Sequence, residues 1–318
     1  MSSIRDHAAR VRTSSGYIDL QINGLKGVDF NSSTLSIEAW DSALEALASD
    51  GTLGFLPTLI TDSADSLRHK LARLAVLCNR TRADVIPLGI HLEGPFISPI
   101  AGYVGAHPPQ YAIQGDVDLM KGWMDASQGQ IRLVTLAPEC DREGAVTRYL
   151  SDCGVLVAAG HTNATLDELK RAIDSGLSLF THLGNACPSS VSRHDNVLNR
   201  ALSLKHALRY TLIADGYHLP PWLLRTWIDF LGLDRVAIVS DAISAAGLPA
   251  GTHRLGDQEI NVGPDGVPRS PDGTHFVGSG ATLGKMADWL EPTGWYSKSD
   301  LSLLLRQNAL KWLGIAMD

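Results

Sequence analysis

The sequence has few cysteines, and their spacing argues against a disulfide framework. Its four cysteines, Cys78, Cys140, Cys153 and Cys187, are far apart and form no C-x-x-C pair. Such spacing is typical of reduced thiols in a cytosolic protein. We expect Cys187, the one nearest to the functional motifs described below, to be a small buried hydrophobic side chain.

Long apolar runs, an N-terminal signal and an excess of positive charge are also missing. No apolar run approaches the roughly 20 residues that span a bilayer. The N-terminal stretch MSSIRDHAARVRTSS has no apolar signal core, so we expect a cytoplasmic protein. The net charge of -7 argues against nucleic acids and anionic membranes as partners.

The rest of the composition is that of an ordinary globular protein. Hydrophobic residues make up 44% of the 318 residues and charged residues 19%. A chain of this length buries a large core and often forms one α/β barrel. Because no internal repeat, low-complexity tract or convincing linker divides it, we expect residues 1–318 to form a single catalytic barrel domain.

Eight short apolar runs bounded by turn residues predict buried strands. Most are nearly continuous in apolar residues and do not alternate, as expected of parallel strands covered on both faces. The eight runs are Tyr17–Asn23, Leu53–Ile60, Ile86–Gly94, Ile131–Glu139, Val155–His161, Leu177–Leu183, Tyr210–Gly216 and Val236–Ala242.

Helical patterns separate these strands. The clearest spans Thr165–Ser175, where Thr165 and Glu168 form a T-x-x-E capping box and Gly176 follows the last turn. The other predicted helices are Ser36–Ser49, Ser63–Asn79, Pro220–Leu231 and Asp300–Leu313, and Gly251–Gly273 predicts a β-hairpin or surface loop. Strands that alternate with helices in this way predict a (β/α)8 TIM-type barrel, with an open doubly wound sheet as the alternative.

Ligand-type side chains stand at the ends of most predicted strands, where barrel active sites lie. They are Gln21, Asn23, His91, Glu93, His161, His182, Asp215, His218 and Asp241. Glu93, His161 and His182 form a set of two histidines and one carboxylate, which leaves a coordination position for water as in catalytic zinc sites. We expect one divalent ion, zinc or ferrous iron, because this donor set suits both.

Each histidine also has a simpler interpretation as a hydrogen-bonded core residue, and only the joint placement favours ligation. His91 has the same strand parity as Glu93, and we expect it to support the site from behind. The remaining histidines, His7, His69, His206, His253 and His275, are expected to be surface or structural residues.

A set of motifs follows in order along the chain: IDLQING, LPTLITDS, GIHLEGPF, GAHPPQ, TLAPE, AGHTNAT, THLGNACP, IADGYH and VSDA. This ordered set resembles the N-acetylglucosamine-6-phosphate deacetylase family of the amidohydrolase superfamily, and the match runs from about Gly16 to Gly280. The most specific are HLEGPF, AGHTNAT and THLGNA in this order and spacing. The resemblance implies a metal-dependent barrel hydrolase that converts N-acetylglucosamine 6-phosphate to glucosamine 6-phosphate and acetate.

The resemblance also implies roles for individual residues. Glu93, His161 and His182 would bind the metal, Asp241 would be the catalytic acid and base, and His107 would polarise the acetyl carbonyl. The implied substrate-binding residues are Ala106, His107, Asn185, Ala186, Arg193, His218, Phe276, Val277 and Gly278. Binuclear relatives carry H-x-H on the first strand, whereas this chain has Gln21 and Asn23 there, which implies one metal ion.

Several alternatives stay open at this stage. The β-sandwich that family members build from both chain ends is expected to be absent, which leaves the oligomeric state open, a homodimer included. The same hydrolase could act on an unphosphorylated or epimeric N-acyl amino sugar or on a cyclic amide. A metal-free barrel lyase or isomerase and a non-catalytic sugar-binding barrel are further alternatives. Arg193 is either a phosphate ligand or a surface arginine paired with Asp195.

Overall fold

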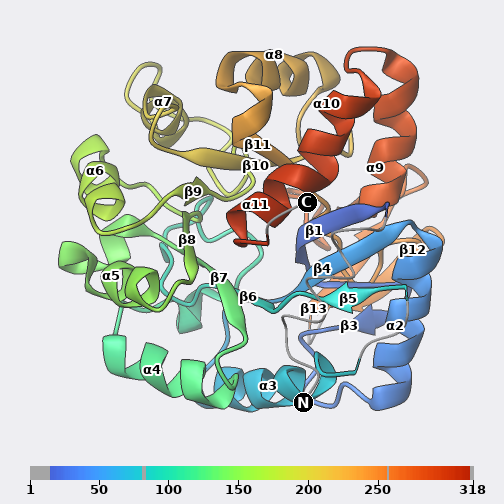
Figure 1. Cartoon of the computed structure of the whole chain (residues 1–318), viewed down its shortest axis with the longest axis horizontal. Coiled ribbons are helices and arrows are strands. Elements are labelled where there is room, and N and C mark those ends of the chain that lie inside the picture. Colours follow the sequence, from blue (N-terminus) through green and yellow to red (C-terminus); the bar gives the residue numbers. More distant parts are fainter. Residues whose placement is uncertain (1–14, 81–83, 256–257, 316–318) are drawn as a thin grey trace.

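Eight parallel strands form a nearly closed barrel that is surrounded by a ring of helices (Figure 1). The structure is a computed structural model that describes residues 15–80, 84–255 and 258–315. The strands follow the order β1 (Tyr17–Ile22), β4 (Thr52–Leu59), β6 (Ile90–Glu93), β7 (Ile131–Leu136), β8 (Leu156–Ala159), β9 (Leu179–Phe180), β10 (Arg209–Ile213) and β11 (Val236–Val239). This confirms the predicted TIM-type barrel. The prediction for His7 lies outside the described residues.

The barrel closes between β1 and β11 through a short set of contacts. Ile22 and Ala242 form a parallel bridge, and the N–H of Asp241 donates to the carbonyl of Gln21 at 2.9 Å. The buried Asp19 carboxyl adds to this seam, because its Oδ1 accepts from the N–H of Ser240 at 3.1 Å. At this seam a hydrogen bond from a side chain therefore replaces part of the main-chain hydrogen bonding that joins neighbouring strands elsewhere in the barrel.

Four predicted helices are present within one or two residues of their expected bounds. They are α2 (Ile37–Ser49), α3 (Ala64–Leu77), α6 (Leu166–Asp174) and α8 (Pro221–Leu231). Ser36 and Ser63 cap the first two by accepting a backbone N–H. The predicted capping box is also confirmed, since Thr165 and Glu168 satisfy each other's backbone N–H groups.

Four other helices were missed, and one predicted helix contains a π-helical segment. No clear pattern in the sequence indicated α4 (Val117–Ala126), α5 (Ala145–Asp152), α7 (Val197–Ser203) and α9 (Leu283–Leu290). The first three bury only two apolar side chains each, which is too short a stripe to show periodicity. The predicted helix Asp300–Leu313 is divided into α10 (Lys298–Ser302), a π-helical segment η6 (Leu303–Gln307) and α11 (Asn308–Trp312).

Six of the eight predicted strands are at least two residues shorter than expected, and two of them differ most. Ile86–Gly94 is interrupted and gives β5 (Ile86–Pro87) and β6, because Pro87 has no N–H to donate and Gly89 takes a φ of 135°. Leu177–Leu183 is reduced to β9, since the chain turns before His182.

Smaller sheets complete the fold. The predicted hairpin in Gly251–Gly273 is confirmed as β12 (Gly251–Leu255), β13 (Gln258–Val262) and β14 (Pro268–Arg269), an antiparallel sheet. A second pair, β2 (Gly24–Leu25) and β3 (Val28–Asp29), follows β1 directly. Within the described residues, no helix is both long enough and apolar enough to cross a membrane.

The Asp19 seam predicts a specific pH dependence of stability. Burial raises the pKa of Asp19 to about 7, so the folded chain binds this proton more tightly than the unfolded chain does. Stability from this group is therefore fully present below its ordinary pKa near 4 and is lost as the pH rises through about 7. Asp19→Asn keeps an acceptor oxygen but cannot ionise. Its unfolding free energy should fall less than that of the wild type between pH 5 and pH 8.

Urea unfolding at a series of pH values measures this difference. Asp118→Asn is the control, because the Asp118 side chain is 90% exposed, and its curve should follow that of the wild type. Parallel curves for Asp19→Asn and the wild type would mean that Asp19 is already ionised in the folded chain at pH 5.

Candidate active site

A cavity of about 1040 Å³ lies at the carboxyl ends of the barrel strands. Polar and charged side chains that follow several different strands meet in it, as barrel active sites require. The predicted site residues that line it are Asn23, Glu93, Ala106, His107, His161, His182, Asn185, Ala186, His218, Asp241, Phe276, Val277 and Gly278. Of the remaining predicted residues, Gln21 lies just behind this wall and Arg193 lies outside the lining.

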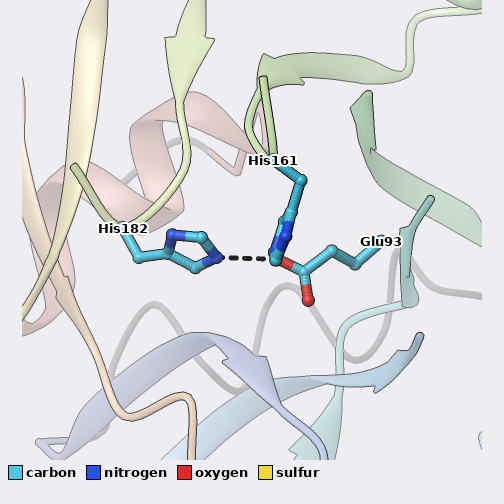
Figure 2. A group of neighbouring side chains, drawn as sticks. All are labelled: Glu93, His161 and His182. Carbon is cyan, nitrogen blue, oxygen red and sulfur yellow. Dashed lines mark hydrogen bonds and ion pairs between the residues drawn. The ribbon is translucent and has the colours of Figure 1, made fainter. Parts of the chain in front are cut away.

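Three buried side chains at the bottom of the cavity could hold a metal ion (Figure 2). Glu93 ends β6, whereas His161 and His182 follow β8 and β9. His182 Nε2 is 2.9 Å from Glu93 Oε1 and His161 Nε2 is 3.3 Å from the same oxygen. One ligand atom from each residue lies within 4.8 Å of the others, so a single divalent ion can reach all three.

The backbone turns sharply at three residues whose side chains line the cavity. His161, His182 and Asp241 have positive φ values of 51°, 31° and 47°. Left-handed conformations are uncommon for residues other than glycine and cluster at functional sites, where surrounding packing maintains them. Each of these residues leaves its strand direction abruptly, and this places its side chain in the cavity.

The hydrogen bonds of His161 fit a metal ligand. Its Nδ1 lies 3.0 Å from the carbonyl oxygen of Tyr103, and a carbonyl can only accept, so Nδ1 carries the proton. When Nε2 carries no proton, it presents a lone pair to Glu93 Oε1, which is another acceptor. Two acceptors 3.3 Å apart repel unless a cation or a proton lies between them, and a buried carbonyl partner of this kind is usual for metal-binding histidines.

The pKa shifts of Glu93 and His182 also fit a site for a cation. Burial disfavours the charged forms of both Glu93 and His182. The imidazole hydrogen bonds nevertheless hold the pKa of Glu93 well below its ordinary value, and the carboxylate raises the pKa of His182. The site therefore retains a buried carboxylate, and positive charge is stabilised beside it.

His107 approaches the same carboxylate from the other side. Its Nε2 lies 3.5 Å from Glu93 Oε2, and its ring centroid is 4.2 Å from that of His161. Burial, together with the neighbouring His161, lowers the pKa of His107 to about 4, so the ring is neutral at physiological pH. On its far side, Nδ1 lies 2.8 Å from the hydroxyl of Thr61.

Asp241 lies beside the metal-binding group in the same cavity. Its Oδ1 accepts hydrogen bonds from Asn23 Nδ2 at 2.8 Å and from Gln21 Nε2 at 3.2 Å. Gln21 also donates to Glu93 Oε1 at 3.0 Å. Burial and the charge of Glu93 raise the pKa of Asp241 to about 6. The two amides thus hold this carboxyl group beside Glu93 in a fixed orientation.

His218 and Phe276 also line the cavity. His218 Nδ1 lies 2.7 Å from Oδ2 of Asp215, which holds the pKa of that carboxyl below its ordinary value despite burial. The ring centroids of His218 and Phe276 are 5.1 Å apart. These residues therefore offer an oriented imidazole beside a partly exposed aromatic ring.

The arginine side chains of the neighbouring loop lie outside the cavity. Arg193 is exposed, whereas Ser189 of the same loop lines the wall. The expected alternative partner of Arg193 is engaged elsewhere, because Asp195 Oδ1 lies 2.5 Å from Arg200 Nε. Arg200 also donates to the carbonyl of Ala164 at 3.0 Å. No lysine or arginine is among the described residues that line the cavity.

A layer of threonines lies directly below the site. His91 is fully buried, and its Nε2 lies 2.8 Å from Thr135 Oγ1, which in turn lies 2.7 Å from Thr181 Oγ1. Burial lowers the pKa of His91 to about 4. The ring is outside the metal-binding group and packs behind Glu93, in the place expected for a supporting residue.

Sequence reasoning missed some of the wall. His275 is exposed, as expected of a surface histidine, but it also lines the cavity. Cys187, expected to be a small buried hydrophobic side chain, is half-buried against the core and lines the cavity as well. Thr61, which holds His107, follows β4 at the carboxyl edge of the barrel. Thr61 could have been identified from the sequence, because polar residues that follow barrel strands tend to lie in the active site. The position of His275 depends instead on how the hairpin packs on the barrel.

Comparison with known proteins gives the family. No family model matches the chain. The chain is 32% identical over 303 residues to N-acetylglucosamine-6-phosphate deacetylase from Bacillus subtilis (strain 168), a match that covers 94% of this chain and 75% of the relative. It is 34% identical over 282 residues to the protein of the same name from Mus musculus, with 86% and 67% covered.

A solved structure with bound ligand extends this similarity. An aspartate-to-alanine variant of N-acetyl-D-glucosamine-6-phosphate deacetylase from Mycobacterium smegmatis, in complex with N-acetyl-D-glucosamine-6-phosphate, has a TM-score of 0.85 at 29% identity. This match covers 94% of this chain and 77% of that chain. Shared sequence and shared architecture over most of the barrel lead to one conclusion: the chain belongs to the N-acetylglucosamine-6-phosphate deacetylase family.

Proposed function

We propose that this chain hydrolyses the acetamide of N-acetylglucosamine 6-phosphate and releases glucosamine 6-phosphate and acetate. The observation that carries the proposal is the buried Glu93, His161 and His182 group, which lines one cavity together with Asp241 in a chain of this family. The proposed cofactor is one divalent ion, zinc or ferrous iron. Both metals accept a donor set of two imidazoles and one carboxylate.

The donor chemistry of the site fits such an ion. The Nε2 lone pair of His161 and the Glu93 carboxylate face each other without a donor between them, and His182 Nδ1 is buried without a partner among the described residues. Glu93, His161 and His182 would hold the ion. When bound, it supplies Lewis-acid polarisation and activates water as a nucleophile at neutral pH.

The chain itself supplies the proton transfers and part of the charge stabilisation. Asp241 is the proposed general base that accepts the proton of the attacking water, and it returns a proton to the departing amine. A neutral His107 donates a hydrogen bond to the acetyl oxygen, whose negative charge grows as the tetrahedral centre forms. Gln21 and Asn23 orient Asp241 for this work.

In this proposal the sugar and its phosphate lie beside His218, Phe276, Asn185 and Ala186, which also line the cavity. Arg193 is the proposed phosphate ligand, because its guanidinium can donate two parallel hydrogen bonds. In the described residues it makes no ion pair with Asp195, which binds Arg200, so its side chain is available to an anion.

Removal of either imidazole ligand should release the metal. His161→Ala and His182→Ala each delete one proposed ligand, so element analysis of the purified variants should show strongly reduced zinc or iron. His69→Ala is the matched control, since His69 is exposed on α3 and remote from the cavity lining. Full occupancy in both variants would exclude these residues as ligands. About one tightly held ion per chain is expected in the wild type.

Asp241→Asn should separate catalysis from metal binding. The amide cannot accept the proton of water, so kcat should fall by roughly 10²–10⁴-fold, while element analysis shows the metal content of the wild type. Release of acetate from N-acetylglucosamine 6-phosphate measures turnover. Near-normal kcat would transfer the role of general base to another residue, with Asp215 the first candidate.

Arg193→Ala tests the phosphate contact. Loss of a charge-assisted hydrogen bond costs about 1.5–3 kcal/mol, so KM for the phosphorylated substrate should rise about ten- to a hundredfold. KM for N-acetylglucosamine should barely change. Arg225→Ala is the control, because Arg225 lies on α8 with its side chain 52% exposed. An equal response to both substrates would make Arg193 structural and favour an unphosphorylated N-acyl amino sugar as the substrate.

A further inference from the structure

Two of the three histidines beside Glu93, His161 and His107, have opposite hydrogen-bond partners at Nδ1. His161 gives its Nδ1 proton to the Tyr103 carbonyl and presents a bare Nε2. His107 has a different partner, and we propose that Thr61 is the positioning residue that holds His107 as a neutral Nε2–H donor in the deacetylation reaction. This inference rests on the proposed function, in which His107 donates a hydrogen bond to the acetyl oxygen.

The backbone of Thr61 decides where the His107 proton lies. The N–H of Thr61 points at His107 Nδ1 over 3.3 Å. A backbone N–H can only donate, so Nδ1 must accept and carries no proton. The single proton of the neutral ring is then on Nε2, the atom that faces Glu93 and the cavity.

The hydroxyl of Thr61 strengthens the same arrangement. Thr61 Oγ1 lies 2.8 Å from His107 Nδ1, and because Nδ1 is already an acceptor, the hydroxyl donates to it. This hydrogen bond is shorter than the one from the Thr61 N–H, and it is shielded from solvent because Thr61 is only 2% exposed. The ring is therefore fixed in both orientation and tautomer from the side opposite the substrate.

A neighbouring glycine leaves the space that this hydroxyl needs. A Cβ atom added to Gly94 would lie 2.2 Å from Thr61 Oγ1, far closer than any van der Waals contact. Gly94 directly follows the proposed ligand Glu93 and has a φ of 82°. The glycine of the HLEGPF motif thus admits the Thr61 hydroxyl between the ends of β4 and β6, and the hydroxyl reaches His107 from there.

Thr61→Val keeps the backbone N–H and the branched shape but removes the hydroxyl. Loss of one neutral hydrogen bond predicts a fall in kcat of about two- to tenfold, with KM for N-acetylglucosamine 6-phosphate and the metal content unchanged. Thr61→Ser should restore kcat. A fall confined to KM, or failure of serine to restore kcat, would overturn the positioning role.

A double-mutant cycle separates positioning from a general structural effect. In a His107→Gln background, Thr61→Val should cause no further loss of kcat, because the ring that it orients is gone. An equal loss in both backgrounds would overturn the inference.

A readout without substrate keeps this test distinct from that of the proposed function. NMR of the zinc-loaded protein with ¹⁵N-labelled histidines reports ring tautomers, and the His107 signals are those that vanish in His107→Gln. We expect the Nε2–H tautomer for His107, and an Nδ1–H or doubly protonated ring would overturn the inference. Absence of deacetylation by the wild type would instead reject the proposed function and leave the tautomer result standing.

Discussion

The Glu93 carboxylate is the group on which the rest of the site depends. It is 2% exposed, and an ion removed from water at this depth costs several kcal/mol unless its surroundings compensate. Three imidazoles and the Gln21 amide surround it at 2.9 to 3.5 Å. These partners come from residues at or beyond the carboxyl ends of different strands, so the carboxylate can only be buried once the barrel has formed around it.

The imidazole rings of His161 and His107 differ in which nitrogen carries the proton, because their Nδ1 atoms have different hydrogen-bond partners. His161 meets a carbonyl, an obligatory acceptor, and therefore turns a lone pair toward the cavity. His107 meets a backbone N–H, an obligatory donor, and therefore turns a proton toward it. The distinction between the proposed metal ligand and the proposed hydrogen-bond donor is thus made by the Tyr103 carbonyl and the Thr61 N–H. If either ring proton moved to the other nitrogen, one of these main-chain groups would lose its hydrogen bond.

Strand periodicity and strand-end chemistry were enough to predict the barrel and to bring Glu93, His161 and His182 together, because parallel strands present their carboxyl ends at one edge. The turn after each strand was not predictable. A positive φ at His161 or Asp241 follows from packing across the barrel, and no local residue preference signals it. The same holds for His275, which lines the cavity only because the β12–β14 sheet folds back over the barrel.

The first strand shows how one set of positions can serve both closure and chemistry. Asp19, Gln21 and Asn23 have the same parity on β1 and its end, so their side chains share one side of the strand. Asp19 binds Ser240 at the barrel seam, while Gln21 and Asn23 bind Asp241, one residue further along the chain. The two amides donate to the carboxylates and hold Glu93 and Asp241 side by side without a positive charge of their own. Burial, together with the charge of Glu93, therefore raises the pKa of Asp241.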